Sequence, residues 1–489
     1  MIDTDSYALA LLLASAAGLV AILLSRLTER TRIPTPLLVL VGAATIATFV
    51  PSVGTPDAVT VEHVVTACLV LILFDGGLHI GWRRFRAAAG PIASVGLLGT
   101  FLTAAAGAVL LHLAFGLDWY LAVLVATAVA PTDPAVVFSI LGQRQIRGRS
   151  GTILEGESGA NDPVGIALMG SLLAAGTLTW QAAGQVTTTF LLQMIVGGAI
   201  GVIGGRAMLW FNQKVALPNE ALYPLRSLLC AFALYGIATL AHGSGFLAVF
   251  IAGILLGDPV APYKREIERF HSALASLGEI VAFLVLGLTV DLSVVARPDV
   301  WLPGLILGLG LALLIRPIAA GLCLLPARLK PNELSFVLFA GLKGAVPILL
   351  GEFLRAAQVP DAERLYGIVV VVVTFSVLVQ GSLVHPVVRM LKLPSRTTEL
   401  EPWALGVRLR EEPNGVHRLR VGAGSPADGT TVSQLAERIG DMWVSIVVRE
   451  SRLVPIGDET QLQAGDDVVV LADPELHDEL NRQFSATPH

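Results

Sequence analysis

Apolar runs of about 20 residues, each long enough to cross a bilayer as an α-helix, alternate with short polar segments from Met1 to about Leu393. The pattern predicts a polytopic α-helical membrane protein. We expect thirteen spans, near residues 6–26, 33–51, 61–80, 90–115, 119–141, 152–175, 186–211, 222–241, 245–257, 270–290, 300–325, 333–354 and 362–391. The residues after about Pro394 are polar and charged. The expected parts are therefore a membrane domain over 1–393, a linker over 394–402 and a soluble domain over 403–489.

Basic residues indicate how the spans are oriented. Connections after odd-numbered spans contain 20 Lys and Arg residues, whereas the alternate connections contain three: Arg297, Arg355 and Arg364. Basic connections stay in the cytoplasm. The N-terminus is therefore expected outside and the soluble domain inside, in a bacterial inner membrane. The excess of acidic residues lies in the tail, whereas the rest of the chain is slightly positive, so the net charge of −5 indicates no nucleic-acid partner.

Ionisable residues inside the spans are the first sign of function. Each costs about 2.5–3.5 kcal/mol near the bilayer centre. We single out four acids and two bases within the spans: Asp75, Asp133, Glu157, Asp162, Arg316 and Lys343. The excess negative charge requires a mobile positive partner, either a proton or a metal cation. The alternative is that all six form fixed structural ion pairs.

Two spans are interrupted by helix-breaking residues. Pro131-Thr132-Asp133-Pro134 divides the fifth span, and residues 341–347, Gly-Leu-Lys-Gly-Ala-Val-Pro, divide the twelfth. These breaks fall at matching places in two six-span halves of opposite orientation, and paired broken helices in inverted repeats mark the binding site of a transporter. We expect Asp133 and Lys343 to offset the partial charges of the half-helix ends. The alternative is a pair of unrelated proline kinks.

The sixth span supplies oxygen ligands. Ser158 and Asp162 are four residues apart and share a helix face. With a carbonyl freed near Thr132, they would form an oxygen cage for a hard cation. Histidines and cysteines are scattered, so we expect no cofactor and no metal other than a transported monovalent cation.

The motif Glu157-Ser-Gly-Ala-Asn-Asp-Pro163, with Thr132-Asp133-Pro134 before it and Gly341-Leu-Lys-Gly-Ala-Val346 after it, resembles the NhaP-like cation/proton antiporters. The resemblance covers about Leu11 to Leu391. It implies a homodimer in which each chain has a six-helix transport domain and a dimerisation domain. It also implies that Asp162 binds cation and proton in turn.

Other roles follow from the same resemblance. Ser158 and Thr132 would help to ligate the ion, as would the third-span acid, which is Asp75 here where relatives often have Glu. Glu157 would pair with Arg316.

Two further positions vary among relatives. Asn161 stands where relatives that move two protons per cation have a second aspartate. Exchange is therefore expected to be electroneutral. Lys343 stands where relatives often have Arg.

The tail has a pattern of its own. Alternating apolar and polar residues between Val416 and Ala472, with a short helix expected over Thr431 to Arg438, resemble the TrkA-C lobe of potassium-conductance regulators. Such a lobe would self-associate or bind a small cytosolic ligand. Residues 422–427 loosely match a dinucleotide fingerprint, but Pro426 blocks the helix start that this fingerprint requires.

The leading hypothesis is an antiporter that exchanges potassium for protons, with sodium as the main alternative. A gated potassium channel is a second possibility, but no Thr-Val-Gly-Tyr-Gly-like filter sequence is present. An intramembrane enzyme built on Asp75 and Asp162 is a third, and it would give the two broken helices no role. The expected partners are the cation, protons, membrane lipid and a second copy of the chain.

Overall fold

A computed structural model of the chain describes residues 35–50, 56–134, 144–146, 149–257, 263–392, 395–397, 415–440, 442–449, 452–457, 459–473 and 476–485, and isolated positions at 12–23 and 137. The described chain divides into two units, Met1–Glu399 and Leu400–His489. The first expected span, 6–26, and most of the expected linker lie outside the described residues.

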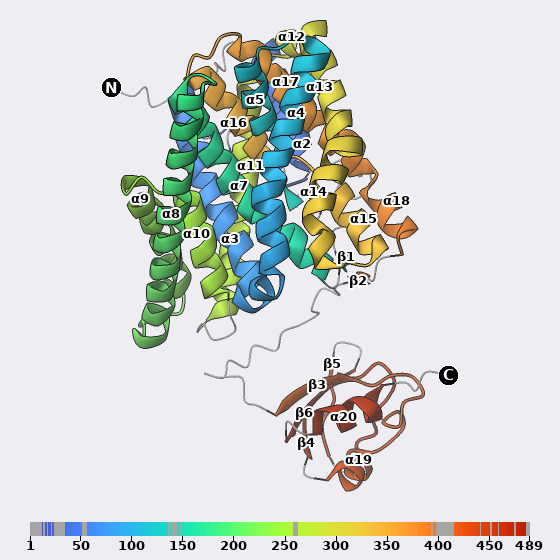
Figure 1. Cartoon of the computed structure of the whole chain (residues 1–489). Coiled ribbons are helices and arrows are strands. Elements are labelled where there is room, and N and C mark those ends of the chain that lie inside the picture. The colour runs from blue at the N-terminus through green and yellow to red at the C-terminus, as the bar shows by residue number, and fades with distance from the viewer. Residues whose placement is uncertain are drawn as a thin grey trace. The chain divides into compact units, whose positions relative to one another are not determined.

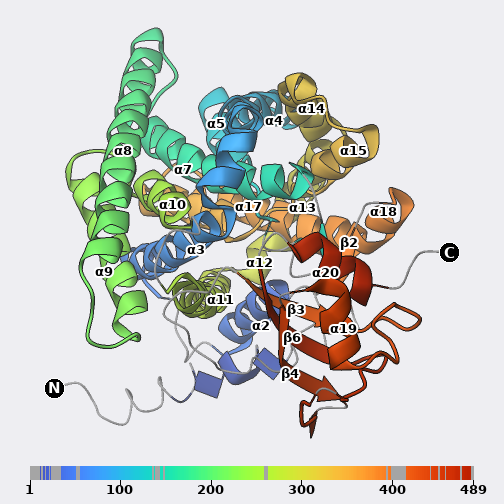
Figure 2. The same cartoon turned by 90° about the horizontal axis from the view of Figure 1, so that it is seen from below.

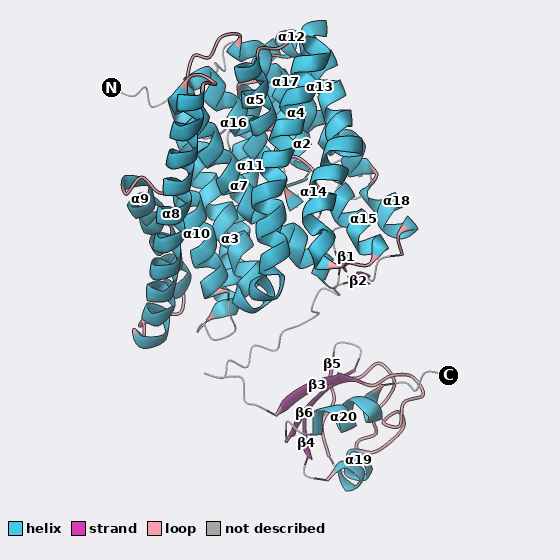
Figure 3. Ribbon diagram, in the orientation of Figure 1, coloured by secondary structure: helices cyan, strands magenta, loops and turns pink. Residues whose placement is uncertain are grey.

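The first unit is helical (Figures 1 and 3). Its α-helices are α2 (Thr35–Phe49), α3 (Ala58–Ala93), α4 (Thr100–Phe115), α5 (Trp119–Ala128), α7 (Arg149–Ala175), α8 (Trp180–Lys214), α9 (Leu222–Leu240), α10 (Gly245–Leu256), α11 (Lys264–Leu288), α12 (Leu292–Val295), α13 (Pro298–Gly310), α14 (Arg316–Leu324), α15 (Pro331–Phe339), α16 (Ala345–Ala356), α17 (Ala362–Phe375) and α18 (Val384–Met390). Short strands β1 (Arg144–Ile146) and β2 (Ser395–Thr397) pair antiparallel.

Six stretches of the described helices are long and apolar enough, by length and composition, to cross a membrane. They are Ala58–Phe115, Trp180–Lys214, Leu222–Leu240, Lys264–Leu288, Pro298–Ala327 and Ala362–Gln380. Three shorter apolar helices, α2, α5 and α10, accompany them. The chain therefore has the helical content of a multi-pass membrane protein.

The helices are arranged around α3, α7 and α11. Helices α8 and α9 lie side by side on one flank and pack against α10, whereas α13, α14 and α15 occupy the opposite flank (Figure 2). Helix α3 packs against α7, α10 and α11, and α16 packs against α5, α7, α11 and α17. Four charged residues of this region, Glu157, Asp162, Arg316 and Lys343, are between 1% and 7% exposed, so they lie in a low-dielectric interior.

Three segments in this unit are π-helical: η2 (Ser94–Gly99), η3 (Leu311–Ile315) and η5 (Ser376–Gln380). Each directly continues an α-helix: η2 joins α3 to α4, η3 joins α13 to α14, and η5 follows α17. A short 3₁₀ turn, η4 (Leu325–Ala327), follows α14. Single π turns often occur at functional sites.

The expected polar connection near residues 81–89 is helical instead. Gly81 has a positive φ of 65° and interrupts the helix, after which the chain is helical again from Trp82 to Phe115. Arg83, Arg84 and Arg86 lie in this stretch. Arginine has a high helix propensity, so its charge orients a span without ending the helix.

The second unit is a small α+β domain. Strands β3 (Val416–Arg420), β4 (Met442–Arg449), β5 (Arg452–Leu453) and β6 (Asp467–Ala472) form an antiparallel sheet in the order β3-β6-β4-β5. Helix α19 (Val432–Ile439) begins with a capping box between Thr431 and Gln434, and α20 (His477–Phe484) contributes Leu480 and Phe484 to the core.

One buried ion pair stabilises that domain. Asp466 is completely buried and accepts hydrogen bonds from Arg449 at 2.9 and 2.8 Å and from the backbone N–H of Gln463 at 2.8 Å. Burial alone would raise the pKa of the Asp466 carboxyl, but these hydrogen bonds outweigh it and hold the pKa below its ordinary value.

Candidate cation site at two broken helices

The two interrupted helices meet at their breaks. The chain leaves helical geometry after α5 at Val129 and is non-helical through Asp133, and a second break separates α15 from α16 over residues 340–344. The backbone N–H of Asp133 donates to the carbonyl of Leu342 at 2.8 Å. The breaks are therefore joined to each other by main-chain hydrogen bonding, and their other backbone groups need partners from side chains.

Lys343 and Asp133 supply two of those partners. The Lys343 ammonium donates to the carbonyls of Ala130 at 3.0 Å and Pro131 at 3.1 Å, which are freed where α5 ends. The Asp133 carboxylate lies against Gly344, the residue that precedes α16, so closely that a Cβ at Gly344 would overlap it. A carboxylate at a helix N-terminus is stabilised by the helix dipole. The positive charge of Lys343 thus lies at the free carbonyl groups that follow α5, and the negative charge of Asp133 lies at the N-terminus of α16.

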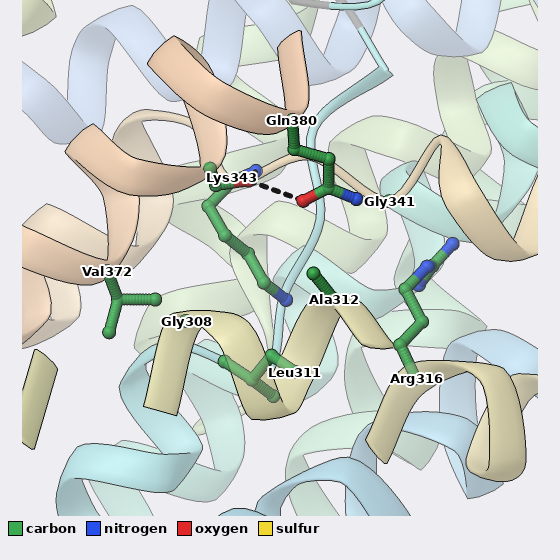
Figure 4. A pocket seen from close by; sticks show the side chains of 9 residues that line it. Gly308, Leu311, Ala312, Arg316, Gly341, Lys343, Val372 and Gln380 are labelled. Carbon is green, nitrogen blue, oxygen red and sulfur yellow. Dashed lines mark hydrogen bonds between the residues drawn. The ribbon is translucent and has the colours of Figure 1, made fainter. Parts of the chain in front are cut away.

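The π-helical segment η5, which follows α17, is hydrogen-bonded to the second break. Ser376 accepts a hydrogen bond from the backbone N–H of Lys343 at 3.1 Å and donates to Gln380, which in turn donates to the carbonyl of Phe339. Figure 4 shows Gln380 and Lys343 on the wall of a small pocket, opposite Leu311. The π-helical segment η5 presents both polar side chains, Ser376 and Gln380, to the break.

Thr132 and Asn161 connect the first break to α7. Asn161 donates through its side-chain nitrogen to the Thr132 hydroxyl at 2.8 Å, and its side-chain oxygen lies 3.4 Å from the Thr132 backbone nitrogen. Both residues are buried, as is Ser158 one turn earlier on α7. The structure therefore brings Asn161 of α7 to the first break.

Asp162 is the carboxylate of this group without a fixed partner. Its side chain is 7% exposed, and its Oδ1 has no hydrogen-bond partner among the described residues. On α7 it lies between Asn161, which is bonded to Thr132, and Gly165, which packs against Pro131. A buried carboxylate with an open oxygen is costly unless a cation or a proton occupies it.

Glu157 and Arg316 form a separate ion pair. Arg316 donates to both carboxylate oxygens of Glu157, at 2.7 and 3.1 Å. It also donates to the carbonyls of Val337 and Leu338, each at 3.1 Å, near the end of α15. Both charged residues are buried. Two N–H groups of the planar guanidinium bind the two oxygens of one carboxylate, which is a strong bidentate arrangement.

Asp75 lies in a different hydrogen-bonded group. It accepts from Ser272 of α11 at 3.0 Å, and its carboxylate lies 3.3 Å from Nδ1 of His79 one turn along α3. His271 packs against Phe74 and contacts Ser227 of α9 at 2.8 Å. The groups around Asp75 are therefore those of the α3, α9 and α11 interface.

Glu279 on α11 is an acid that was not among the residues predicted from the sequence. Its Oε1 is buried without a hydrogen-bond partner among the described residues. Its position could have identified it, because Glu279 lies inside the expected span 270–290, where an acid is as costly as the four predicted acids.

Comparisons with known proteins agree with this architecture. Residues 16–390 match the family "Sodium/hydrogen exchanger, transmembrane", and residues 416–485 match the "TrkA-C domain". The chain is 38% identical to the K(+)/H(+) antiporter NhaP of Alkalimonas amylolytica over 331 residues, which are 66% of this chain and 56% of that protein. It is 31% identical to the K(+)/H(+) antiporter NhaP2 of Shewanella oneidensis over 493 residues, covering 99% and 85%.

The fold also resembles a solved structure, the sodium proton antiporter MjNhaP1 from Methanocaldococcus jannaschii at pH 8. The TM-score is 0.64 at 21% identity, and the match covers 77% of this chain and 99% of that one. The resemblance expected from the sixth-span motif and from the tail is thereby confirmed. The chain belongs to the sodium/hydrogen exchanger family and has a TrkA-C domain that follows its membrane region in the sequence.

Proposed function

We propose that the protein is a secondary antiporter that exchanges a monovalent cation, potassium in the first place, for protons by alternating access. The observation that carries this proposal is the buried Asp162, whose Oδ1 has no partner among the described residues. It lies on α7 between Asn161, which is bonded to Thr132, and Gly165, which packs against Pro131 at the first break. Thr132, Ser158 and Asn161 form its polar surroundings, and Asp133 and Lys343 offset the half-helix ends. Asp162 binds the cation and the proton alternately.

The direct test is purified protein in liposomes with a trapped pH-sensitive dye, to which potassium, sodium, lithium or choline is added in turn. Potassium-driven proton movement supports the proposal. Relatives named as K(+)/H(+) antiporters favour potassium, whereas the Na(+)/H(+) antiporter NhaH of Halobacillus aidingensis, 26% identical, favours sodium. Sodium-only exchange would transfer the mechanism to that ion. Dissipation of the pH gradient in choline alone would indicate a leak and reject the proposal.

We expect exchange to be electroneutral. Asp162 has Asn161 as its neighbour rather than a second acid, so its two occupied states, with a proton or with one monovalent cation, have the same charge. A voltage of 100 mV acts on one transported charge with about 2.3 kcal/mol. Imposing such voltages on the proteoliposomes with a lipophilic ion should leave the initial exchange rate unchanged. A steep voltage dependence would mean that a second charge moves.

Removal of the tail should leave transport intact. The described residues of the proposed site all lie in Met1–Glu399, and the TrkA-C domain belongs to the other unit. A chain truncated after Glu399 should exchange cations at a rate within about threefold of the full chain, a change of about 0.6 kcal/mol, but with an altered dependence on pH or cytosolic ligand. A truncated protein that inserts normally and does not transport would contradict this division of roles.

The remaining features of the proposal concern assembly and orientation. The distribution of basic residues is consistent with thirteen spans in two inverted halves. It is also consistent with a bacterial inner membrane, an N-terminus outside and a tail in the cytoplasm. A second copy of the chain would associate through the dimerisation domain. The exposed apolar side chains of α8 and α9, such as Ile203, Leu229 and Leu240, face either that copy or lipid.

A further inference from the structure

The second break lacks one particular helical hydrogen bond. In a continuous helix the backbone N–H of Lys343 would donate to the carbonyl of Phe339, four residues earlier. Instead, this N–H donates to the Ser376 hydroxyl at 3.1 Å, and the Phe339 carbonyl accepts from the side-chain nitrogen of Gln380. Ser376 in turn donates to Gln380 at 3.2 Å. Two side chains of η5 therefore occupy both ends of the hydrogen bond that the break removes.

The proline of this segment does not account for the loss of that bond. Pro347 has no backbone N–H, and its ring crowds the carbonyl four residues earlier, which is that of Lys343. It therefore removes the next bond along the chain, from residue 347 to residue 343. Gly341 and Gly344 lower the helix propensity without removing a donor. The covalent structure of the segment leaves the Lys343 N–H free to bond to the Phe339 carbonyl.

The Ser376–Gln380 pair is enclosed by protein. Ser376 is 3% exposed and Gln380 is 6% exposed. An unpaired backbone N–H or carbonyl is costly in such an interior, so the break persists only while the pair provides partners for it. A small cavity lined by both side chains, Gly341 and Lys343 lies next to the break (Figure 4), which gives this segment room to shift when the pair is lost.

The position of the second break sets that of the first. The carbonyl of Leu342 accepts from a backbone N–H of the first break at 2.8 Å. The Lys343 ammonium donates to the carbonyls that follow α5 at 3.0 and 3.1 Å. In the first break, Thr132 is bonded to Asn161, the residue before Asp162. Hydrogen bonds joined by short stretches of backbone thus lead from η5 through both breaks to the neighbour of Asp162.

We propose that Ser376 and Gln380 are positioning residues of the cation site, which hold the second break open by replacing its missing helical hydrogen bond. The inference rests on the proposed antiport function and adds two residues that act through the break and not on the ion. When either side chain is lost, the break shifts toward a continuous helix, and the Lys343 ammonium moves away from the first break. The cation then meets displaced ligands, so its affinity falls while the proton-binding carboxylate is unchanged.

The test compares Ser376→Ala, Gln380→Leu and the double variant with Tyr366→Phe. Tyr366 lies on α17, the helix that η5 continues, is 3% exposed, and its hydroxyl contacts Thr289 at 2.7 Å. Its variant removes an equally buried hydrogen-bonding group away from both breaks, so it is the matched control. Proteoliposomes give the half-saturating concentration of the cation that the wild type transports and the maximal rate. In detergent, the rise in unfolding temperature with cation concentration gives the affinity without transport.

The two assays separate this proposal from the antiport function. A wild type that shows the cation-dependent rise in unfolding temperature but no exchange would reject antiport and still allow the affinities of the variants to be compared. A wild type with neither property would overturn both proposals.

Each single variant should raise the half-saturating concentration about tenfold and leave the maximal rate within about twofold of wild type. The double variant should raise it by no more than about tenfold as well, because the two side chains act through one structure. Tyr366→Phe should keep the affinity within about twofold of wild type, with a drop in unfolding temperature similar to that of the single variants.

Three results would overturn the positioning role. Equal affinities in Ser376→Ala, Gln380→Leu and Tyr366→Phe would leave the pair with a structural role alone. A lower maximal rate at unchanged affinity would assign the pair to the conformational change and not to the arrangement of ligands. Effects that multiply in the double variant, to about a hundredfold, would show that the two side chains act separately.

Discussion

Replacing Asp162 with asparagine is expected to abolish cation-driven proton exchange, lowering the initial rate at least a hundredfold. Asparagine cannot bind a proton reversibly and has no charge to hold a monovalent cation, so both occupied states are lost together. The side chain keeps its size, and Asp162 Oδ1 has no hydrogen-bond partner to lose among the described residues. The variant should therefore fold and elute from a sizing column as the wild type does.

Proteoliposomes with a trapped pH dye measure this effect, and Asp299→Asn is a matched control. Asp299 is half-exposed and forms a surface pair with Arg297 at 2.8 Å, so its neutral variant should exchange within about twofold of wild type, or 0.4 kcal/mol. Cation-dependent proton flux that persists in a correctly folded Asp162→Asn protein would remove Asp162 from the proposed role and direct attention to Asp133 or Glu279.

Arg316→Ala should produce the largest loss of stability of any single substitution in the membrane unit. It leaves the carboxylate of Glu157, which is 1% exposed, without its partner, and removing one partner of a buried pair costs about 3–5 kcal/mol. The carbonyls of Val337 and Leu338 lose their donors as well. Thermal unfolding in detergent measures the change.

Two further variants separate stability from transport in this experiment. Arg297→Ala removes an exposed partner and should cost at most about 1 kcal/mol. Gly341→Ala places a methyl group where the Arg316 guanidinium lies, so it should lower stability without changing any charge. If Arg316→Ala keeps the wild-type unfolding temperature and alters only cation affinity, Arg316 belongs to the transport site and not to the scaffold.

The helix breaks were predictable because their cause is local. Proline removes a backbone donor and glycine removes the side chain, so residues 131–134 and 341–347 could be recognised without a structure. The capped helix at Thr431 was predictable for the same reason. Helix α20 was not expected, because its core contacts, Leu480 and Phe484, depend on the sheet that they cover.

The neighbours of each buried acid could not be derived from the sequence. Helical spacing places Ser158 and Asp162 on one face, but it does not say which residue of another helix faces them. Asp75 was expected to join the ion ligands, and the partners that the structure gives it are Ser272 and His79. The π-helical segments gave no sequence signal, because the one-residue widening of a turn is set by packing.

The hydrogen bonds that cross between the breaks have a consequence for biosynthesis. Lys343, which covers the carbonyl of Ala130, follows it by 213 residues. At 5–20 residues per second, translation takes roughly 10–40 s to cover that interval. During this time the first break stands in the bilayer or the translocon without its ammonium partner. The N-terminal half therefore reaches its stable form only after the C-terminal half has been inserted, so a nascent chain that stalls between the two breaks would be a natural substrate for membrane quality-control proteases.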